Sequence, residues 1–300
     1  MDGMRSAVPT DRGAIEAFIS GAGTRDDPPV LTEYKMRAMT GEVPGRSFVG
    51  FAGEDLVGYV QAAWHPPITD EGRGHWAFEV VVDPGEIGDA TRLLSCAGAD
   101  IPGEAALLVW VWDAALDAQL EAAGFREVRR IERMSVELPL AIDAPLPEGI
   151  RLAPFRVHRD ESAWIATNNR AFAGHPENGA VNSEEMRGRM ALSWFSAGDL
   201  LMAWQEDQLA GSCWTKVRPG GVGEIYIIGV DPAVEGSGLG KALLMAGARH
   251  LHRERNCSRL MLFTDTANVR AQRLYTSVGF VTDLVNRQLE FPDRTGAPAV

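Results

Sequence analysis

Residues 224–244 read EIYIIGVDPAVEGSGLGKALL, and this stretch decides the fold. Its apolar, β-branched first half ends at Asp231-Pro232, glycines follow at positions 236, 238 and 240, and apolar residues then recur at helical spacing. The pattern predicts a strand, a glycine-rich loop and the N-terminus of a helix. Free backbone N–H groups and the helix dipole attract an anion at such a loop, so the stretch predicts a phosphate site.

The spacing of the glycines distinguishes between the known kinds of phosphate loop. A P-loop needs glycine, four residues and then Gly-Lys-Ser/Thr, but here Glu235 replaces the first glycine and Ala242 replaces the hydroxyl residue. A dinucleotide fingerprint needs G-x-G-x-x-G in a βαβ unit, whereas this loop reads G-x-G-x-G late in the chain. Residues 235–240 instead resemble the acyl-CoA loop of Gcn5-related N-acetyltransferases, Q/R-x-x-G-x-G/A, in every position but the first. A glycine-rich turn without a ligand is the alternative for the loop taken alone.

A second signature follows within about 60 residues. The segment 268–280, NVRAQRLYTSVGF, resembles the acetyltransferase pattern N-x-x-A-x-x-x-Y-x-x-x-G-F and predicts a short helix that ends at a glycine. With both signatures in order, the chain is identified as a member of the Gcn5-related N-acetyltransferase superfamily. The resemblance implies acetyl-CoA as cosubstrate and a mixed, largely antiparallel twisted sheet flanked by helices.

The chain also contains a diverged internal repeat. An apolar strand pattern ends at Asp83-Pro84 as it does at Asp231-Pro232, and a helical pattern ends at Gly124-Phe125 as it does at Gly279-Phe280. The repeat predicts an α+β protein of two tandem acetyltransferase domains, a degenerate one over residues 1–144 and a catalytic one over 145–300. The first copy of the loop contains two acidic residues and no G-x-G, so we expect it to have lost anion binding.

Composition limits the partners. The net charge of the 300-residue chain is −12, which argues against nucleic acid and anionic membranes. Residues 1–150 contain 12 basic and 25 acidic residues, whereas residues 151–300 contain 17 and 16, so the second half is the one able to accept a polyanion. No run of 18 apolar residues and no signal pattern occur, and the 3 scattered cysteines predict neither a disulfide nor a metal site. We expect a cytoplasmic protein, monomeric or weakly dimeric, with no metal and a small-molecule partner.

A closer resemblance covers residues 150–290. HPENG at 175–179 and WTKV at 214–217 look like segments of the mycothiol synthase family. That resemblance implies direct acetyl transfer to the cysteinyl amine of cysteinyl-glucosaminyl-inositol, the last step of mycothiol synthesis.

The resemblance implies catalytic roles for two residues. Glu224 takes the place of the general base, and Tyr275 that of the acid which protonates the departing thiolate. An α-amine has an unperturbed pKa of about 7.7–8.0, so a carboxylate acting through water can deprotonate it. The alternative interpretations are a partly exposed strand carboxylate and a packed aromatic ring.

The remaining implied site residues fall into two sets. Those expected to bind acetyl-CoA are Ile228, Gly229, Val230, Glu235, Gly236, Ser237, Gly238, Leu239, Gly240, Lys241, Asn268 and Arg273. Those expected to bind the acceptor are Glu33, Glu177, Lys216 and Phe263.

Two of these positions depart from the family pattern, because Glu235 replaces Gln or Arg and Phe263 replaces a substrate-contacting tyrosine. Two alternatives therefore stay open: an acetyltransferase for another small amine or amino sugar, and a non-catalytic acetyl-CoA-binding protein.

Overall fold

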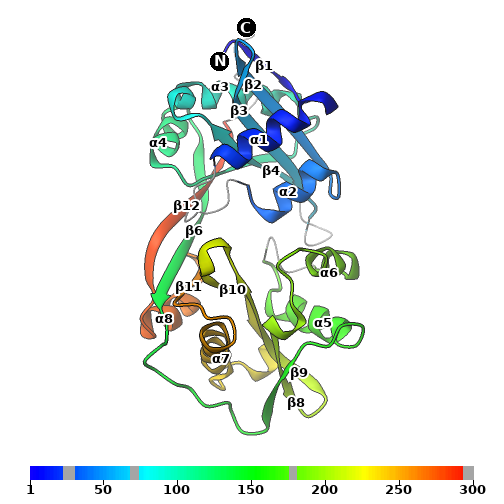
Figure 1. Ribbon diagram of the computed structural model, residues 1–300, viewed down its shortest axis with the longest axis vertical. Helices are drawn as coiled ribbons and strands as arrows, with labels where there is room; N and C mark the ends of the chain where they lie inside the picture. The colour runs from blue at the N-terminus through cyan, green and yellow to red at the C-terminus, as the bar shows by residue number, and fades with distance from the viewer. Residues whose placement is uncertain (23–30, 68–73, 176–180, 293–300) are drawn as a thin grey trace. The chain divides into compact units, whose positions relative to one another are not determined.

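The computed structural model describes residues 1–22, 31–67, 74–175 and 181–292. By the contacts between its residues, the chain divides into two units, Met1–Arg130 with Val285–Val300, and Ile131–Leu284. Each unit contains a mixed sheet with helices on it (Figure 1).

The first unit begins with a meander of four antiparallel strands. Its strand order is β1-β2-β3-β4-β5-β12, in which only the β4–β5 pair is parallel. Its elements are β1 (Gly3–Ser6), η1 (Pro9–Asp11), α1 (Arg12–Ala22), α2 (Glu33–Thr40), β2 (Gly45–Ala52), β3 (Asp55–His65), β4 (His75–Val82), η2 (Pro84–Asp89), α3 (Ala90–Asp100), β5 (Ala106–Val111), α4 (Ala114–Ala122) and the second part of β12 (Val281–Glu290).

The second unit repeats this topology. Its strand order is β7-β8-β9-β10-β11-β6, again with a single parallel pair, β10–β11. Its elements are the second part of β6 (Arg126–Glu137), β7 (Ile150–Pro154), α5 (Glu161–Ala171), α6 (Ser183–Met190), η3 (Ala197–Asp199), β8 (Leu200–Gln205), β9 (Gln208–Val217), η4 (Pro219–Gly221), β10 (Gly223–Val230), η5 (Pro232–Val234), α7 (Leu239–Arg253), β11 (Arg259–Asp265) and α8 (Val269–Ser277). The predicted fold class, with mixed and largely antiparallel sheets, is thereby confirmed.

The last strand of each sheet comes from the other half of the sequence. β6 follows α4 in the chain but pairs with β11 from Ile131 to Glu137. β12 follows α8 but pairs with β5 from Arg287 to Glu290. The division by contacts therefore differs from the boundary expected at residues 144 and 145, because the two strands are exchanged.

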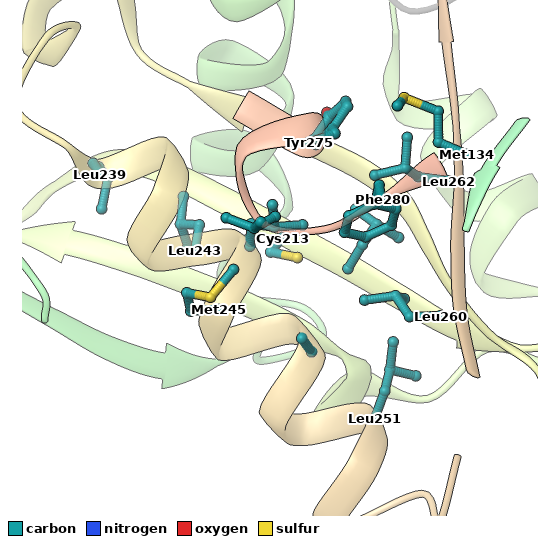
Figure 2. Packing of buried hydrophobic residues seen from close by; sticks show 14 of the residues in the cluster. Met134, Cys213, Leu239, Leu243, Met245, Leu251, Leu260, Leu262, Tyr275 and Phe280 are labelled. Atoms are coloured by element: carbon teal, nitrogen blue, oxygen red, sulfur yellow. The ribbon is translucent and has the colours of Figure 1, made fainter. Parts of the chain in front are cut away.

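The sheet of the second unit is buried on both faces. The neighbouring β9 residues Cys213 and Trp214 point to opposite faces, as the alternation of a strand requires. Cys213 belongs to an apolar cluster with α7 and α8, and Trp214 to a cluster with α5 and α6. Figure 2 shows the first cluster, in which the predicted apolar stripe of α7 contributes Leu239, Leu243 and Leu251.

Candidate active site

The parallel strands β10 and β11 separate soon after they meet. β10 pairs with β11 only over Gly223–Ile225, and a bulge follows between Ile225 and Ile227, whereas its pairing with β9 continues to Val230. In the first unit the corresponding strands stay paired from His75 to Glu79. Among the described residues, the β11-facing edge of β10 therefore has no strand partner at Ile228, Gly229 and Val230, which were predicted to bind acetyl-CoA.

The glycine loop joins β10 to the N-terminus of α7. Gly236 and Gly238 have φ angles of +80° and +86°, which side chains with a Cβ rarely adopt. The backbone N–H groups of Gly236, Gly238, Gly240 and Lys241 donate no hydrogen bond to the described residues. The loop therefore presents several unused donors at the positive end of a helix dipole.

The unusual Glu235 of this loop has a cationic partner. Arg270 Nη1 lies 2.7 Å from Glu235 Oε2, and both side chains are more than half exposed. An ion pair so exposed contributes little to stability, but it offsets the carboxylate charge beside the donors.

Asn268 caps α8 by accepting the Ala271 N–H at 3.1 Å, and Arg273 lies exposed on the same helix.

Glu224 is a buried carboxylate on β10, 4% exposed. Arg218 Nε donates to its Oε2 at 2.6 Å, and Lys216 Nζ lies 3.6 Å from the same oxygen. Lys216 is opposite Glu224 in the β9–β10 register, and Arg218 begins the turn of that hairpin. The hairpin thus places two cations beside the predicted base, and one of them, Arg218, was not among the predicted site residues.

Aromatic rings surround these two cations. Lys216 Nζ lies 4.8 Å from the ring centre of Trp194 and 4.4 Å from that of Tyr226. The Arg218 guanidinium carbon lies 5.9 Å from the ring centre of Phe263 on β11. All three distances are in the range of cation–π attraction. Three predicted residues, Glu224, Lys216 and Phe263, are therefore brought together, with Arg218 between the first and the last.

Tyr275 lies on α8, 7% exposed, in the cluster of Figure 2, with its ring 5.8 Å from that of Phe280. Its hydroxyl makes no hydrogen bond to the described residues. Burial, together with the nearby Cys213, raises the pKa of Tyr275 above its usual value of 10. The raised pKa favours the neutral phenol, whose hydroxyl can donate or accept a hydrogen bond.

Two further residues, Glu33 and Glu177, were predicted to bind the acceptor. Glu33 begins α2 of the first unit and is half-buried. Glu177 lies outside the described residues. In the part of the chain that is described, no three His, Cys, Asp or Glu side chains are grouped so that they could hold a metal ion. None of the described helices has the length and apolar character needed to cross a membrane.

The first unit has the opposite electrostatics at the equivalent loop. Its η2 segment contains two carboxylates, Glu86 and Asp89. Carboxylates in such a loop would repel a pyrophosphate. The continued pairing of β4 and β5 is a second difference from the second unit, and the loss of anion binding in the first unit stays a prediction.

The architecture is that of the Gcn5-related N-acetyltransferases. The sequence profile of the Acetyltransferase (GNAT) family matches residues 164–280. A GCN5-related N-acetyltransferase from Sphaerobacter thermophilus superposes with a TM-score of 0.65 at 18% identity, covering 96% of this chain and 94% of that one. A tandem GNAT protein from the clavulanic acid biosynthesis pathway gives a TM-score of 0.67 at 14% identity, covering 96% and 97%.

Sequence relatives narrow this class. The mycothiol acetyltransferase of Thermobispora bispora is 36% identical over 294 residues, which cover 91% of this chain and 93% of the relative. That of Thermomonospora curvata is 38% identical over 256 residues, 82% of each chain. The chain belongs to the mycothiol acetyltransferase family.

Proposed function

We propose that this protein transfers the acetyl group of acetyl-CoA directly to the cysteinyl amine of cysteinyl-glucosaminyl-inositol, completing mycothiol. The observation that carries the proposal is the buried carboxylate of Glu224 on β10. It lies just before the point where β10 separates from β11, and β10 then leads into the glycine loop. The names of the relatives supply the acceptor.

The unused polar groups of the chain suit acetyl-CoA. The free N–H groups of Gly236, Gly238, Gly240 and Lys241 would bind the pyrophosphate. The unpaired edge of β10 would bind the pantetheine arm, with the Val230 N–H near the thioester carbonyl. Acetyl-CoA supplies the activated acetyl thioester, so the protein needs no covalent intermediate.

Proton transfer then falls to two side chains. The acceptor arrives as an ammonium ion with a pKa of about 8, and Glu224 takes a proton from it through a water molecule. As the nitrogen–carbon bond forms and the carbon–sulfur bond breaks, the Tyr275 hydroxyl donates a proton to the departing thiolate. The second proton that the acceptor nitrogen loses returns to the Tyr275 phenolate, and the proton held by Glu224 passes to solvent. Because burial raises the pKa of Tyr275, the phenolate left after transfer is a strong base and recovers its proton readily.

A thiol-release assay tests this function. Free CoA thiol is followed with cysteinyl-glucosaminyl-inositol and, in parallel, with glucosaminyl-inositol, cysteine and simple amino sugars. We expect the cysteinyl compound to have a kcat/KM at least tenfold above that of each other amine. Bound acetyl-CoA with no thiol released from any acceptor would contradict acetyl transfer and favour a binding protein.

One observation favours a second acceptor class. Phe263 replaces a tyrosine that contacts substrate in the family, and its ring packs against Arg218. An acceptor with fewer hydroxyl groups than the inositol sugar would suit this change. In the same assay, higher kcat/KM with another amine than with the cysteinyl compound would establish this alternative.

A further inference from the structure

The contact between Arg218 and Glu224 belongs to no motif of the sequence. Arg218 lies in the turn between β9 and β10, and its side chain is 19% exposed against 5% for Glu224. We propose that Arg218 is a positioning residue, which holds one oxygen of Glu224 so that the other faces the acceptor amine. This inference rests on the proposed function, in which Glu224 is the base.

The two oxygens of Glu224 are in unequal surroundings. Arg218 and Lys216 both approach Oε2, at 2.6 and 3.6 Å. Oε1 accepts no hydrogen bond from the described residues. A carboxylate held at one oxygen keeps the lone pairs of the other for a water molecule or an amine proton. The asymmetry is what a base with a fixed orientation requires.

The two cations differ in what they can fix. Lys216 Nζ, at 3.6 Å, is beyond hydrogen-bond distance, so it contributes charge without directing the carboxylate. The planar guanidinium of Arg218 donates from Nε along a defined direction. At 2.6 Å this charge-assisted bond is the one that sets the rotation of the Glu224 carboxylate.

Phe263 restrains the guanidinium in turn. Its ring on β11 lies 5.9 Å from Arg218 Cζ, whereas Glu224 lies on the neighbouring strand β10. The ring limits the planes that the guanidinium can adopt. Phe263 contacts Arg218, and Arg218 in turn holds Glu224. The phenylalanine that replaces the family's tyrosine at position 263 thus affects the orientation of the base.

Replacing Arg218 tests the inference in the full-length enzyme. We expect Arg218→Ala to lower kcat about 10- to 100-fold, the scale of a misplaced catalytic group, while the Kd for acetyl-CoA stays within about twofold. Added guanidinium chloride at millimolar concentration should restore part of kcat, because a free guanidinium ion can occupy the vacated position. Arg218→Lys keeps the charge without the directed Nε–H, so its kcat should fall between those of Arg218→Ala and the wild type.

A matched control and a double variant separate positioning from stability. Arg156 binds the buried Asp160 through Nε at 3.0 Å and Nη2 at 2.8 Å, away from the site, so Arg156→Ala should keep the wild-type kcat and gain nothing from guanidinium. Arg218→Ala should add little to the loss already caused by Glu224→Gln, since the two act as one unit. If Arg218→Ala does not fold, Arg218→Gln takes its place in every comparison.

Three outcomes would overturn the inference: unchanged kcat, a loss that guanidinium does not relieve, or a full additional loss in the Glu224→Gln background. Failure of the proposed function looks different, because the wild-type enzyme would then release no thiol with any amine, or Glu224→Gln alone would leave turnover unchanged.

Discussion

Tyr275 combines deep burial with a hydroxyl group that has no partner among the described residues. Since the hydroxyl makes no hydrogen bond there, Tyr275→Phe should change the free energy of unfolding by less than about 1 kcal/mol. It should lower kcat about 10- to 100-fold, the usual range for loss of a general acid, with the KM for acetyl-CoA nearly unchanged. A urea titration measures the free energy of unfolding, and steady-state kinetics measures kcat and KM. A kcat equal to that of the wild type would show that the ring serves packing alone.

Cys213 should make the protein sensitive to alkali. The thiol is fully buried, and desolvation raises its pKa from 9.0 to about 12. The pKa of the Cys213 thiol is higher in the folded state than in the unfolded state. The stability that this difference contributes is therefore complete below pH 9 and is lost as pH rises toward 12. At pH 10.5 the loss is about 2 kcal/mol relative to pH 7. Urea unfolding at the two pH values should show a smaller difference for Cys213→Ala than for the wild type.

Cys96 supplies the control for this measurement, since its thiol is only partly buried. Cys96→Ala should leave most of the alkaline loss in place. An unchanged pH dependence in Cys213→Ala would mean that other groups, such as the buried Tyr59 with its pKa near 12, cause the loss.

At the scale of single residues, the sequence predicts what lies inside a motif. Glu224 is predicted from its place before the loop, and the buried position observed for it is compatible with the proposed base. Arg218 was missed because a hairpin turn carries no motif. A signal was available, since a short turn places Lys216 opposite Glu224 and Arg218 lies two residues further along, at the start of that turn. This signal can be used only when the register of the β9–β10 hairpin is known, and the sequence alone does not specify that register.

Among the elements, the loop between β10 and α7 depends most on its residue types. Gly238 has a φ angle of +86°, and a Cβ there would meet no atom within 4 Å, so replacement strains the backbone without a clash. Gly238→Ala should cost about 1 kcal/mol of stability. The strained loop would move its N–H donors, and losing one charge-assisted hydrogen bond should raise the Kd for acetyl-CoA about tenfold. Calorimetry and thermal unfolding measure the two effects.

Gly149 provides a control with the same strain. Its φ angle is +77°, its Cβ position is also open, and it lies in the segment before β7. Gly149→Ala should lose similar stability and keep the wild-type affinity for acetyl-CoA. Equal affinity losses in the two variants would indicate a general effect of destabilisation instead of a phosphate site.

The positions of the helices and strands around the site were largely predictable from the sequence, whereas the early separation of β10 from β11 was not. The strand, loop and helix over residues 224–244 follow from apolar periodicity and glycine spacing, and the structure confirms them. The early separation of β10 from β11 depends on a bulge at Tyr226 and on the pairing of each strand with its other neighbour. Such features arise from contacts distant in sequence, which local patterns do not contain.

For the molecule as a whole, the two units should differ in ligand binding although they share a topology. The loop of the first unit contains the carboxylates of Glu86 and Asp89, and β4 stays paired with β5 to Glu79. We expect titration calorimetry to give one acetyl-CoA per chain in the wild type and, with the higher Kd, also one in Gly238→Ala. A stoichiometry of two would show that the first unit also binds the cosubstrate.

The exchange of β6 and β12 decides which half of the chain can fold alone. A fragment of residues 145–300 lacks the segment Ile131–Glu137, which pairs with β11 along its whole length from Arg259 to Asp265. Each lost backbone hydrogen bond costs about 1 kcal/mol, so the missing strand removes a large share of a typical stability of about 5–15 kcal/mol. A fragment of residues 131–284 has nearly the same length and keeps that strand. We therefore expect cooperative unfolding and acetyl-CoA binding from 131–284 but not from 145–300, because the second unit needs β6 beside β11. Folding of 145–300 with normal acetyl-CoA affinity would show instead that β6 is dispensable and that its own β12 can take its place.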